Sequence, residues 1–254
     1  MIMENRHSQI RLFCEAPLKD GAEIVLGKDQ AHYLATVMRK SIGTKIALFN
    51  GKDGCFLAEI RELSRKSATI HCLKQQEAQW YSPDIWLIFA PVKKARLDFM
   101  AQKATELGAS VIWPVRTEYT QVKLIKDERL QANAIEAAEQ TERLDIPEIR
   151  PFADLQDVLS DWPDDRVLLF CDERLLEQGD KTDHSHQAHR ILNDLKADKI
   201  AILVGPEGGF SMVEKDQIDA VPSSVGLSLG PRILRADTAA LAALGLVQAI
   251  KGDW

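Results

Sequence analysis

The chain has few cysteines and no long hydrophobic run. Its 254 residues include only four cysteines, and no two of them form a Cys-x-x-Cys pair. This pattern argues against a disulfide framework or a zinc ribbon, and it suits a reducing cytoplasm. The longest apolar run, from Ala239 to Val247, is well short of the roughly 20 residues that span a membrane. Residues 1–6 lack the apolar segment of a secretory signal. We therefore expect a cytoplasmic protein that does not enter a membrane.

What is present is the composition of an ordinary globular protein, with 45% hydrophobic and 28% charged residues. A chain of this length forms one large domain or two smaller ones. The net charge of −6 is unevenly distributed, because residues 1–74 carry 12 Lys and Arg against 8 Asp and Glu, whereas the remainder carries 20 against 30. A basic first part favours a polyanionic partner there, although chance surface composition gives the same imbalance.

Residues 1–75 predict a small β-barrel-like domain. Short runs of β-branched and aromatic residues between turn signals predict strands over residues 11–15, 22–26, 45–50, 55–63 and 68–73. The turn cluster at residues 50–54 predicts a hairpin between two of these strands. One helix interrupts them; we expect Asp29 to cap it and Leu34, Val37 and Met38 to form its apolar stripe.

Residues 76–254 predict a second domain of the α/β class. A polar stretch over residues 75–83 ends in proline and reads as a linker. After it, buried-type strands are expected over residues 85–90, 111–115, 166–171, 200–204 and 225–229. Helices are expected from Leu97 to a stop at Gly108, over residues 127–143, and over residues 238–251. This alternation predicts a mostly parallel sheet, and polar residues 177–190 predict a loop.

Two loops that follow strands are candidates for a ligand site. Residues 205–211 read Gly-Pro-Glu-Gly-Gly-Phe-Ser, and residues 230–238 read Gly-Pro-Arg-Ile-Leu-Arg-Ala-Asp-Thr. Ligands of open α/β sheets bind outside the carboxyl ends of the strands, and glycine allows a ligand to approach the backbone. Neither loop is a phosphate-binding P-loop or a dinucleotide fingerprint. The alternative is two tight turns joined by a Glu–Arg salt bridge.

These paired loops resemble those of the bacterial 16S rRNA uridine-N3 methyltransferases, a family of the SPOUT class. Residues 102–108, Gln-Lys-Ala-Thr-Glu-Leu-Gly, resemble a helix motif of that family. Glu139-Gln140 with Arg143 resembles its Glu-Gln-x-x-Arg motif, and Arg11-Leu12-Phe13 with the helix over residues 32–39 resembles its PUA-like RNA-binding module. Ala236 and Asp237 stand where many relatives have Thr and Glu.

The resemblance implies a SPOUT-type sheet domain closed by a deep C-terminal trefoil knot, a homodimer, and S-adenosylmethionine as the cofactor. It also implies a PUA-like β-barrel at the N-terminus. The expected cofactor-binding residues come from both loops; they are Leu203, Val204, Gly205, Pro206, Gly208, Leu229, Gly230, Ile233 and Leu234.

The implied reaction moves a methyl group to uridine N3, whose proton must leave. A guanidinium can stabilise the resulting anion on the base; Arg235 is our first candidate and Arg232 our second. Glu207 and Asp237 are candidate general bases. Glu139 is a candidate to act across the dimer, unless it forms only a surface pair with Arg143.

The implied substrate is 16S rRNA, which we expect the enzyme to meet in the assembled small ribosomal subunit. Candidate phosphate contacts are Arg11, Arg39, Lys40 and Lys52. Two alternatives stay open at this point: a SPOUT enzyme with another RNA target, or a non-catalytic RNA-binding assembly factor. The cluster of His184, His186 and His189 could bind zinc, but it adds no cysteine, and we expect no metal.

Overall fold

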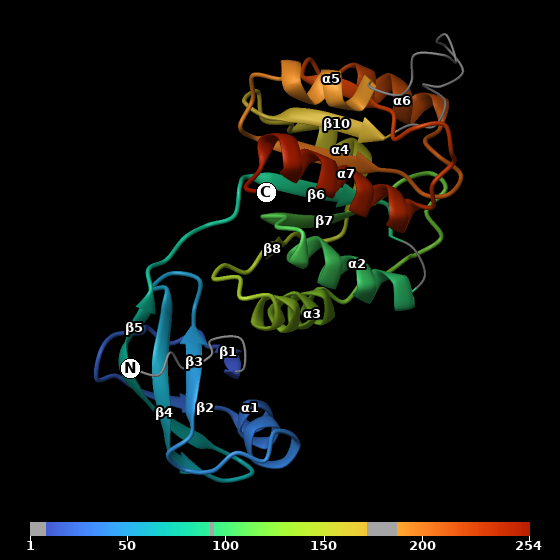
Figure 1. The fold of residues 1–254 in the computed structure, drawn as a ribbon. Coiled ribbons are helices and arrows are strands. Elements are labelled where there is room, and N and C mark those ends of the chain that lie inside the picture. The colour runs from blue at the N-terminus through green and yellow to red at the C-terminus, as the bar shows by residue number, and fades with distance from the viewer. Residues whose placement is uncertain (1–8, 92–93, 172–186) are drawn as a thin grey trace. The chain divides into compact units, whose positions relative to one another are not determined.

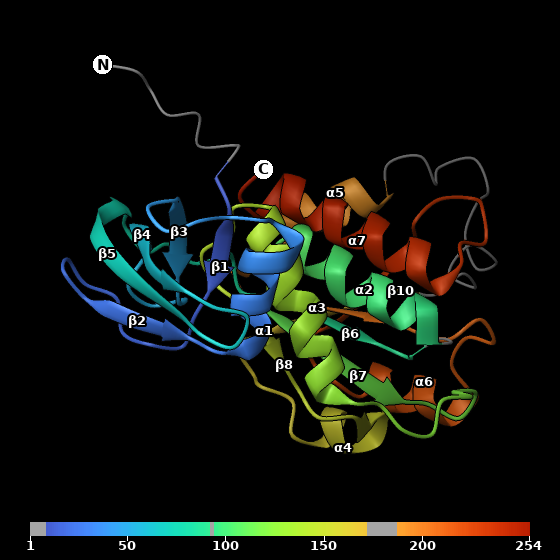
Figure 2. The same ribbon diagram turned by 90° about the horizontal axis from the view of Figure 1, so that it is seen from below.

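The computed structural model describes residues 9–91, 94–171 and 187–254 (Figures 1 and 2). The chain divides into two compact units, of which the first comprises residues 1–81 and 138–146 and the second comprises residues 82–137 and 147–254. The predicted boundary between residues 75 and 76 stays a prediction. Among the described helices, none combines the length and the apolar character that crossing a bilayer requires.

The first unit contains a five-stranded mixed sheet. Its strands are β1 (Arg11–Phe13), β2 (Glu23–Leu26), β3 (Lys45–Phe49), β4 (Cys55–Leu63) and β5 (Ala68–Glu77). They lie in the order β1-β3-β4-β5-β2, with β1 and β3 parallel and the other pairs antiparallel. Register shifts bend the long β4–β5 pair, so that one face of the sheet encloses a core that includes Leu34, Ile46 and Ile60.

The helix of the first unit differs from the prediction in two respects. Gly27 is the N-cap of α1 (Lys28–His32), and no side chain caps this helix; Asp29 lies in its first turn, so its predicted capping role was wrong. A π-helical turn, η2 (Tyr33–Val37), follows directly. A π-turn holds more residues than an α-turn, so the apolar positions shift around the axis. Leu34 is fully buried as predicted, but Val37 is 59% exposed.

The second unit is built on a mostly parallel sheet, as predicted. Its main strands are β6 (Ile85–Phe89), β7 (Val111–Arg116), β10 (Val167–Cys171), β11 (Ile200–Val204) and β12 (Ser224–Leu227). The order is β12-β10-β11-β6-β7-β8, where β8 (Glu148–Ile149) is a short edge strand and β9 (Ala153–Asp154) also pairs with β7. These pairs are parallel throughout. The loops after β7, β11 and β12 therefore leave the same edge of the sheet.

Helices cover both faces of this sheet. One face packs against α2 (Lys94–Glu106), α3 (Asp127–Gln140), α5 (Gln187–Asp194) and α7 (Ala236–Lys251). The other face packs against α4 (Leu155–Ser160) and α6 (Met212–Asp219). Figure 2 shows α4 and α6 below the sheet and α2, α5 and α7 above it. The order of strands in a sheet does not specify whether the chain passes through one of its own loops. The trefoil knot therefore stays a prediction.

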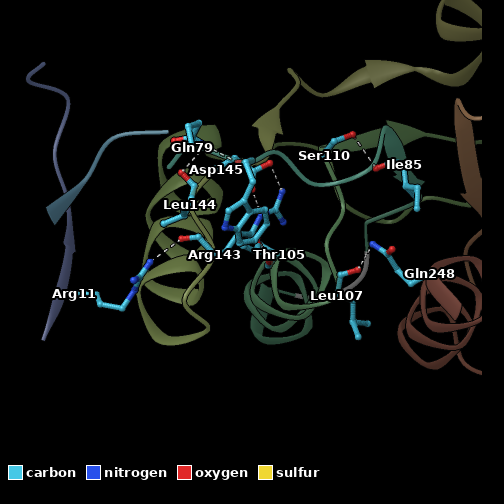
Figure 3. A network of polar contacts seen from close by, with 12 residues as sticks. Arg11, Gln79, Ile85, Thr105, Leu107, Ser110, Arg143, Leu144, Asp145 and Gln248 are labelled. Atoms are coloured by element: carbon cyan, nitrogen blue, oxygen red, sulfur yellow. Dashed lines mark hydrogen bonds and ion pairs between the residues drawn. The ribbon is translucent and has the colours of Figure 1, made fainter. Parts of the chain in front are cut away.

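The end of α2 is fixed where the sequence predicts its stop. Gly108 adopts a φ of +79°, a conformation that favours glycine. A Cβ at this position would also lie 2.4 Å from Nε2 of Gln248, which is fully buried in α7. That amide donates a hydrogen bond of 2.8 Å to the Leu107 carbonyl (Figure 3). The C-terminal helix is thus joined to the end of α2 by a buried polar contact.

Candidate active site

The two candidate loops form one pocket at the carboxyl edge of the parallel sheet. The first loop follows β11 and the second follows β12, and they line a pocket of about 180 Å³. Its wall is completed by Cys171 at the end of β10, and by Ala236 and Ala239 in the first turns of α7. The position is the one expected for a ligand site in an open α/β sheet.

The first loop is shaped by close packing around Gly205. A Cβ at Gly205 would lie 3.1 Å from the ring of Phe210, which is 2% exposed and lines the pocket. Gly209 has a φ of +70° and donates its N–H to the Pro206 carbonyl, which closes a tight turn. The loop ends in a capping box, because Ser211 caps α6 and Glu214 accepts the backbone N–H of Ser211 at 2.8 Å.

The second loop leaves its backbone open to the pocket. Gly230 has a φ of +100°, which residues with a side chain rarely adopt. No backbone hydrogen bond joins residues 229–234 to the rest of the described chain. The Ser228 hydroxyl lines the pocket and is buried, and it has no hydrogen-bond partner among the described residues. Because buried polar groups are normally satisfied, these groups point to a polar ligand.

The acidic residues of the two loops are joined by an arginine that the sequence analysis did not single out. Arg96 in α2 places Nη1 at 3.6 Å from Oε1 of Glu207 and Nε at 3.7 Å from Oδ2 of Asp237. The Glu207 side chain is 59% exposed, so this long ion pair contributes little to stability. The Glu–Arg bridge considered from sequence is therefore made by α2 and not by Arg232 or Arg235.

Arg232 and Arg235 present their charges at the pocket. Both line it and both are exposed. Neither forms a salt bridge within the part of the chain that the structure describes. Arg235 is also the N-cap residue of α7, with an extended backbone. Their guanidinium groups are thus available to an anion that enters the pocket.

Most of the predicted cofactor residues line the pocket. Those that do are Val204, Gly205, Pro206, Leu229, Gly230, Ile233 and Leu234. The other two do not: Leu203 is fully buried in the core between β11 and α6, and Gly208 lies against Tyr119. The sequence analysis missed Cys171, Phe210, Leu227 and Ser228, which lie at strand ends or deeper in the loop. Burial raises the pKa of the Cys171 thiol to about 12, so it is a neutral wall group.

Within the first unit, Glu139 contacts β1, and Arg11 of β1 contacts the segment that follows α3. Oε1 of Glu139 accepts the backbone N–H of Phe13 at 2.9 Å. Arg11 donates from Nη2 to the Arg143 carbonyl at 3.1 Å and lies 5.1 Å from the centre of the Phe49 ring. Arg143, which is 4% exposed, pairs with Asp145 at 2.8 Å (Figure 3). These contacts hold residues 138–146 against β1, and the predicted roles of Glu139 and Arg11 toward the substrate stay predictions.

The remaining candidate RNA contacts lie at the surface of the first unit. Arg39 is exposed just after η2, where it has a φ of +50°, and Lys40 is half-buried beside it. Lys52 is exposed in the β3–β4 hairpin, whose turn is held by the Asn50 side chain accepting the N–H groups of Lys52 and Asp53. These cations are accessible to a phosphate backbone.

Within the described residues, no group of three His, Cys, Asp or Glu side chains is arranged to hold a metal ion. His184 and His186 lie outside those residues. His189 lies in α5, where its ring contacts the Asn193 amide. The expectation that the histidine cluster holds no metal therefore stays a prediction.

Comparison with known proteins identifies the family. The profile of an RNA methyltransferase domain matches residues 80–248, and that of an RNA methyltransferase PUA domain matches residues 18–71. The chain belongs to this family of RNA methyltransferases. The first match covers the sheet domain with both loops of the pocket, and the second covers most of the five-stranded sheet. The predicted family is thereby confirmed, as is the fold class of a mostly parallel α/β sheet domain preceded by a PUA domain.

Individual members of the family align with nearly the whole chain. Ribosomal RNA small subunit methyltransferase E of Rickettsia conorii is 32% identical over 239 residues, which cover 94% of each chain. The enzyme of that name from Bacillus subtilis is 29% identical over 242 residues, covering 89% of this chain and 91% of its own. A crystal structure of the Neisseria gonorrhoeae enzyme bound to S-adenosyl methionine superposes with a TM-score of 0.83 at 29% identity, covering 97% and 99% of the two chains.

Proposed function

We propose that the chain transfers the methyl group of S-adenosylmethionine to N3 of a uridine in 16S rRNA. The observation that carries the proposal is the pocket formed by the loops after β11 and β12, lined by two exposed arginines that form no salt bridge with the described residues. Relatives named small subunit rRNA methyltransferases support the substrate, and the Neisseria gonorrhoeae structure with S-adenosyl methionine supports the cofactor.

The pocket residues fit this cofactor. The backbone groups of residues 229–234 and the Ser228 hydroxyl, which make no such hydrogen bonds to the described residues, can hydrogen-bond an adenine edge. Leu227, Leu229 and Phe210 provide apolar surface for the flat ring. When bound, the cofactor supplies an electrophilic methyl group on a sulfonium. Residues 204–206 and 229–234 would hold it beside the arginines.

The residues at the mouth of the pocket suit the proton and charge changes on the uracil. Loss of the N3 proton leaves a negative charge that spreads over O2 and O4 of the base. Arg235, with Arg232, can stabilise this charge without a change in its own protonation. Glu207 and Asp237 are the candidate acceptors for the proton, and Arg96 holds the two carboxylates near each other.

The proposal extends to the partners of the enzyme. Arg11, Arg39, Lys40 and Lys52 of the first unit would contact RNA phosphates, and Glu139 would act across the dimer. We expect a homodimer that meets its target in the assembled small subunit, in the cytoplasm where ribosomal subunits are built. Equal methylation of naked 16S rRNA and of assembled subunits would contradict the requirement for the subunit.

The test is methyl transfer from labelled S-adenosylmethionine to small ribosomal subunits that lack the modification, with mass identification of the methylated nucleoside. We expect 3-methyluridine from the wild-type chain, and a strong loss with Arg235→Ala. Cofactor binding without product would indicate another RNA target. Neither binding nor product would support a non-catalytic RNA-binding factor, the second alternative.

A further inference from the structure

The turn after β7 brings an exposed tyrosine to the first loop of the pocket. β7 is parallel to β6, which is parallel to β11, so residues 117–120 leave the same edge of the sheet as residues 205–211. A Cβ built on Gly208 would lie 3.3 Å from two atoms of the Tyr119 side chain. Tyr119 therefore lies directly against the loop that also carries Glu207.

This turn is held rigidly by hydrogen bonds. The backbone N–H of Thr117 donates to Oγ1 of Thr120 at 2.9 Å, and the N–H of Thr120 donates to the Thr117 carbonyl at 3.0 Å. The N–H of Glu118 donates to Oε1 of Glu214 at 2.7 Å. The other oxygen of the same carboxylate accepts the N–H of Ser211. One buried carboxylate thus fixes the tyrosine turn and the end of the first loop together.

Tyr119 is partly exposed in this fixed position. The residue is 47% exposed, and its hydroxyl makes no hydrogen bond to the described part of the chain. Exposed aromatic side chains that are held in place serve as stacking platforms for the bases of single-stranded nucleic acids. Met212 and Val213, which follow Ser211, are also exposed, at 68% and 65%. Exposed apolar side chains thus stand on both segments that the Glu214 carboxylate joins, the tyrosine turn and the start of α6.

We propose that Tyr119 stacks on a nucleobase of the RNA substrate at the rim of the pocket. Sequence-specific recognition of RNA uses splayed bases that stack on aromatic side chains. A flat ring on a preorganised turn gives such a base a platform at low entropic cost. A tyrosine ring offers a π-face on which a base can stack, whereas a phosphate is bound by arginine or lysine. This inference rests on the proposed function and adds to it a residue that touches RNA from the catalytic unit.

The test compares steady-state kinetics of three variants on small ribosomal subunits. Loss of one base stack weakens binding by about 5- to 100-fold, so we expect Tyr119→Ala to raise the KM for the subunit by about 10-fold or more. We expect kcat to change much less, and the Kd for S-adenosylmethionine to stay within twofold. Tyr119→Phe keeps the ring and should behave as wild type. Tyr81→Ala removes a 66% exposed tyrosine of the first unit and serves as the matched control.

Each outcome bears on the inference. An unchanged KM in Tyr119→Ala, with wild-type product formation, overturns it while leaving the proposed function intact. A loss of activity accompanied by a change in oligomeric mass, measured by light scattering, also overturns it, because the ring would then pack against a second copy of the chain. If the wild-type enzyme forms no product, the proposed function fails and this inference fails with it.

Discussion

Removal of the Glu214 carboxylate should destabilise the chain more than any surface substitution on α6. Glu214 is 8% exposed and accepts the backbone N–H groups of Ser211 and Glu118 at 2.8 and 2.7 Å. Glu214→Ala leaves both donors without a partner and breaks the capping box. An unsatisfied buried donor costs about 1–3 kcal/mol, so we expect a loss of about 2–5 kcal/mol in the free energy of unfolding.

Thermal unfolding followed by circular dichroism gives the measurement. For a chain of this size, about 1 kcal/mol lowers Tm by about 2–4 °C, so Glu214→Ala should lower it by roughly 5–15 °C. Glu214→Gln keeps one acceptor oxygen, so its Tm should lie between that of the wild type and that of Glu214→Ala. Asp216→Ala, an exposed substitution on the same helix, is the matched control and should change the free energy by less than about 0.5 kcal/mol.

The same variant reports on the pocket. Ser211 ends the first loop of the pocket, and Glu214→Ala removes the acceptor that holds its backbone N–H. We therefore expect this variant to bind S-adenosylmethionine more weakly than the wild type in calorimetric titrations below the unfolding temperature. A Tm within 2 °C of the wild-type value, or a destabilisation equal to that of the Asp216 control, would refute the assignment of Glu214 as the residue that fixes both loops.

Three further predictions concern the pocket and the first unit. Ser228→Ala removes a buried hydroxyl that has no hydrogen-bond partner among the described residues, so we expect unchanged or higher stability but about 3- to 10-fold weaker S-adenosylmethionine binding by calorimetry. Ser224→Ala, whose buried hydroxyl likewise lacks a described partner but lies outside the pocket, should leave binding unchanged. Arg235→Ala should lower the single-turnover rate by about 100-fold with cofactor affinity nearly unchanged, and an unaltered rate would exclude Arg235 from catalysis. Hydrogen bonds from the Leu18 N–H and the Asn50 amide hold the pKa of Asp53 below its ordinary value of 3.8, so the ionised group stabilises the folded state at neutral pH. Asp53→Asn should lose that stability above pH 4, and the difference from wild type in urea unfolding should shrink as the pH falls through the lowered pKa.

Local signals were sufficient for the strands and for the two loops of the pocket. The bounds of β4 and β11 agree with the prediction, because both strands contain runs of apolar residues that end at clear turn or polar residues. Glycine and charge after two buried strands correctly located the pocket loops. Ser211-x-x-Glu214 is a capping-box signature that could also have located α6, which we did not predict.

Other features depend on contacts between distant parts of the chain. Nothing in the sequence around Arg96 shows that it lies between Glu207 and Asp237, because these residues are brought together only by the folded sheet. Likewise, Glu139 resembles part of a functional motif, and only the structure shows its carboxylate on the backbone of Phe13. The π-turn at η2 is a local feature, but no residue type marks it reliably.

The assignment of residues 138–146 to the first unit bears on the order in which the protein can mature during translation. Buried Ala138 and Leu144 pack with Phe49 and Cys55 in that unit, and the Glu139 and Arg143 segment contacts β1. The first unit therefore cannot complete its packing until residue 146 has left the ribosome, by which time β6, α2, β7 and all of α3 have already been synthesised. Such long-range closure slows folding and leaves the N-terminal sheet with an uncovered apolar surface on the nascent chain. The N-terminal unit would thus be finished only when more than half of the chain has been synthesised, although its sheet is made first.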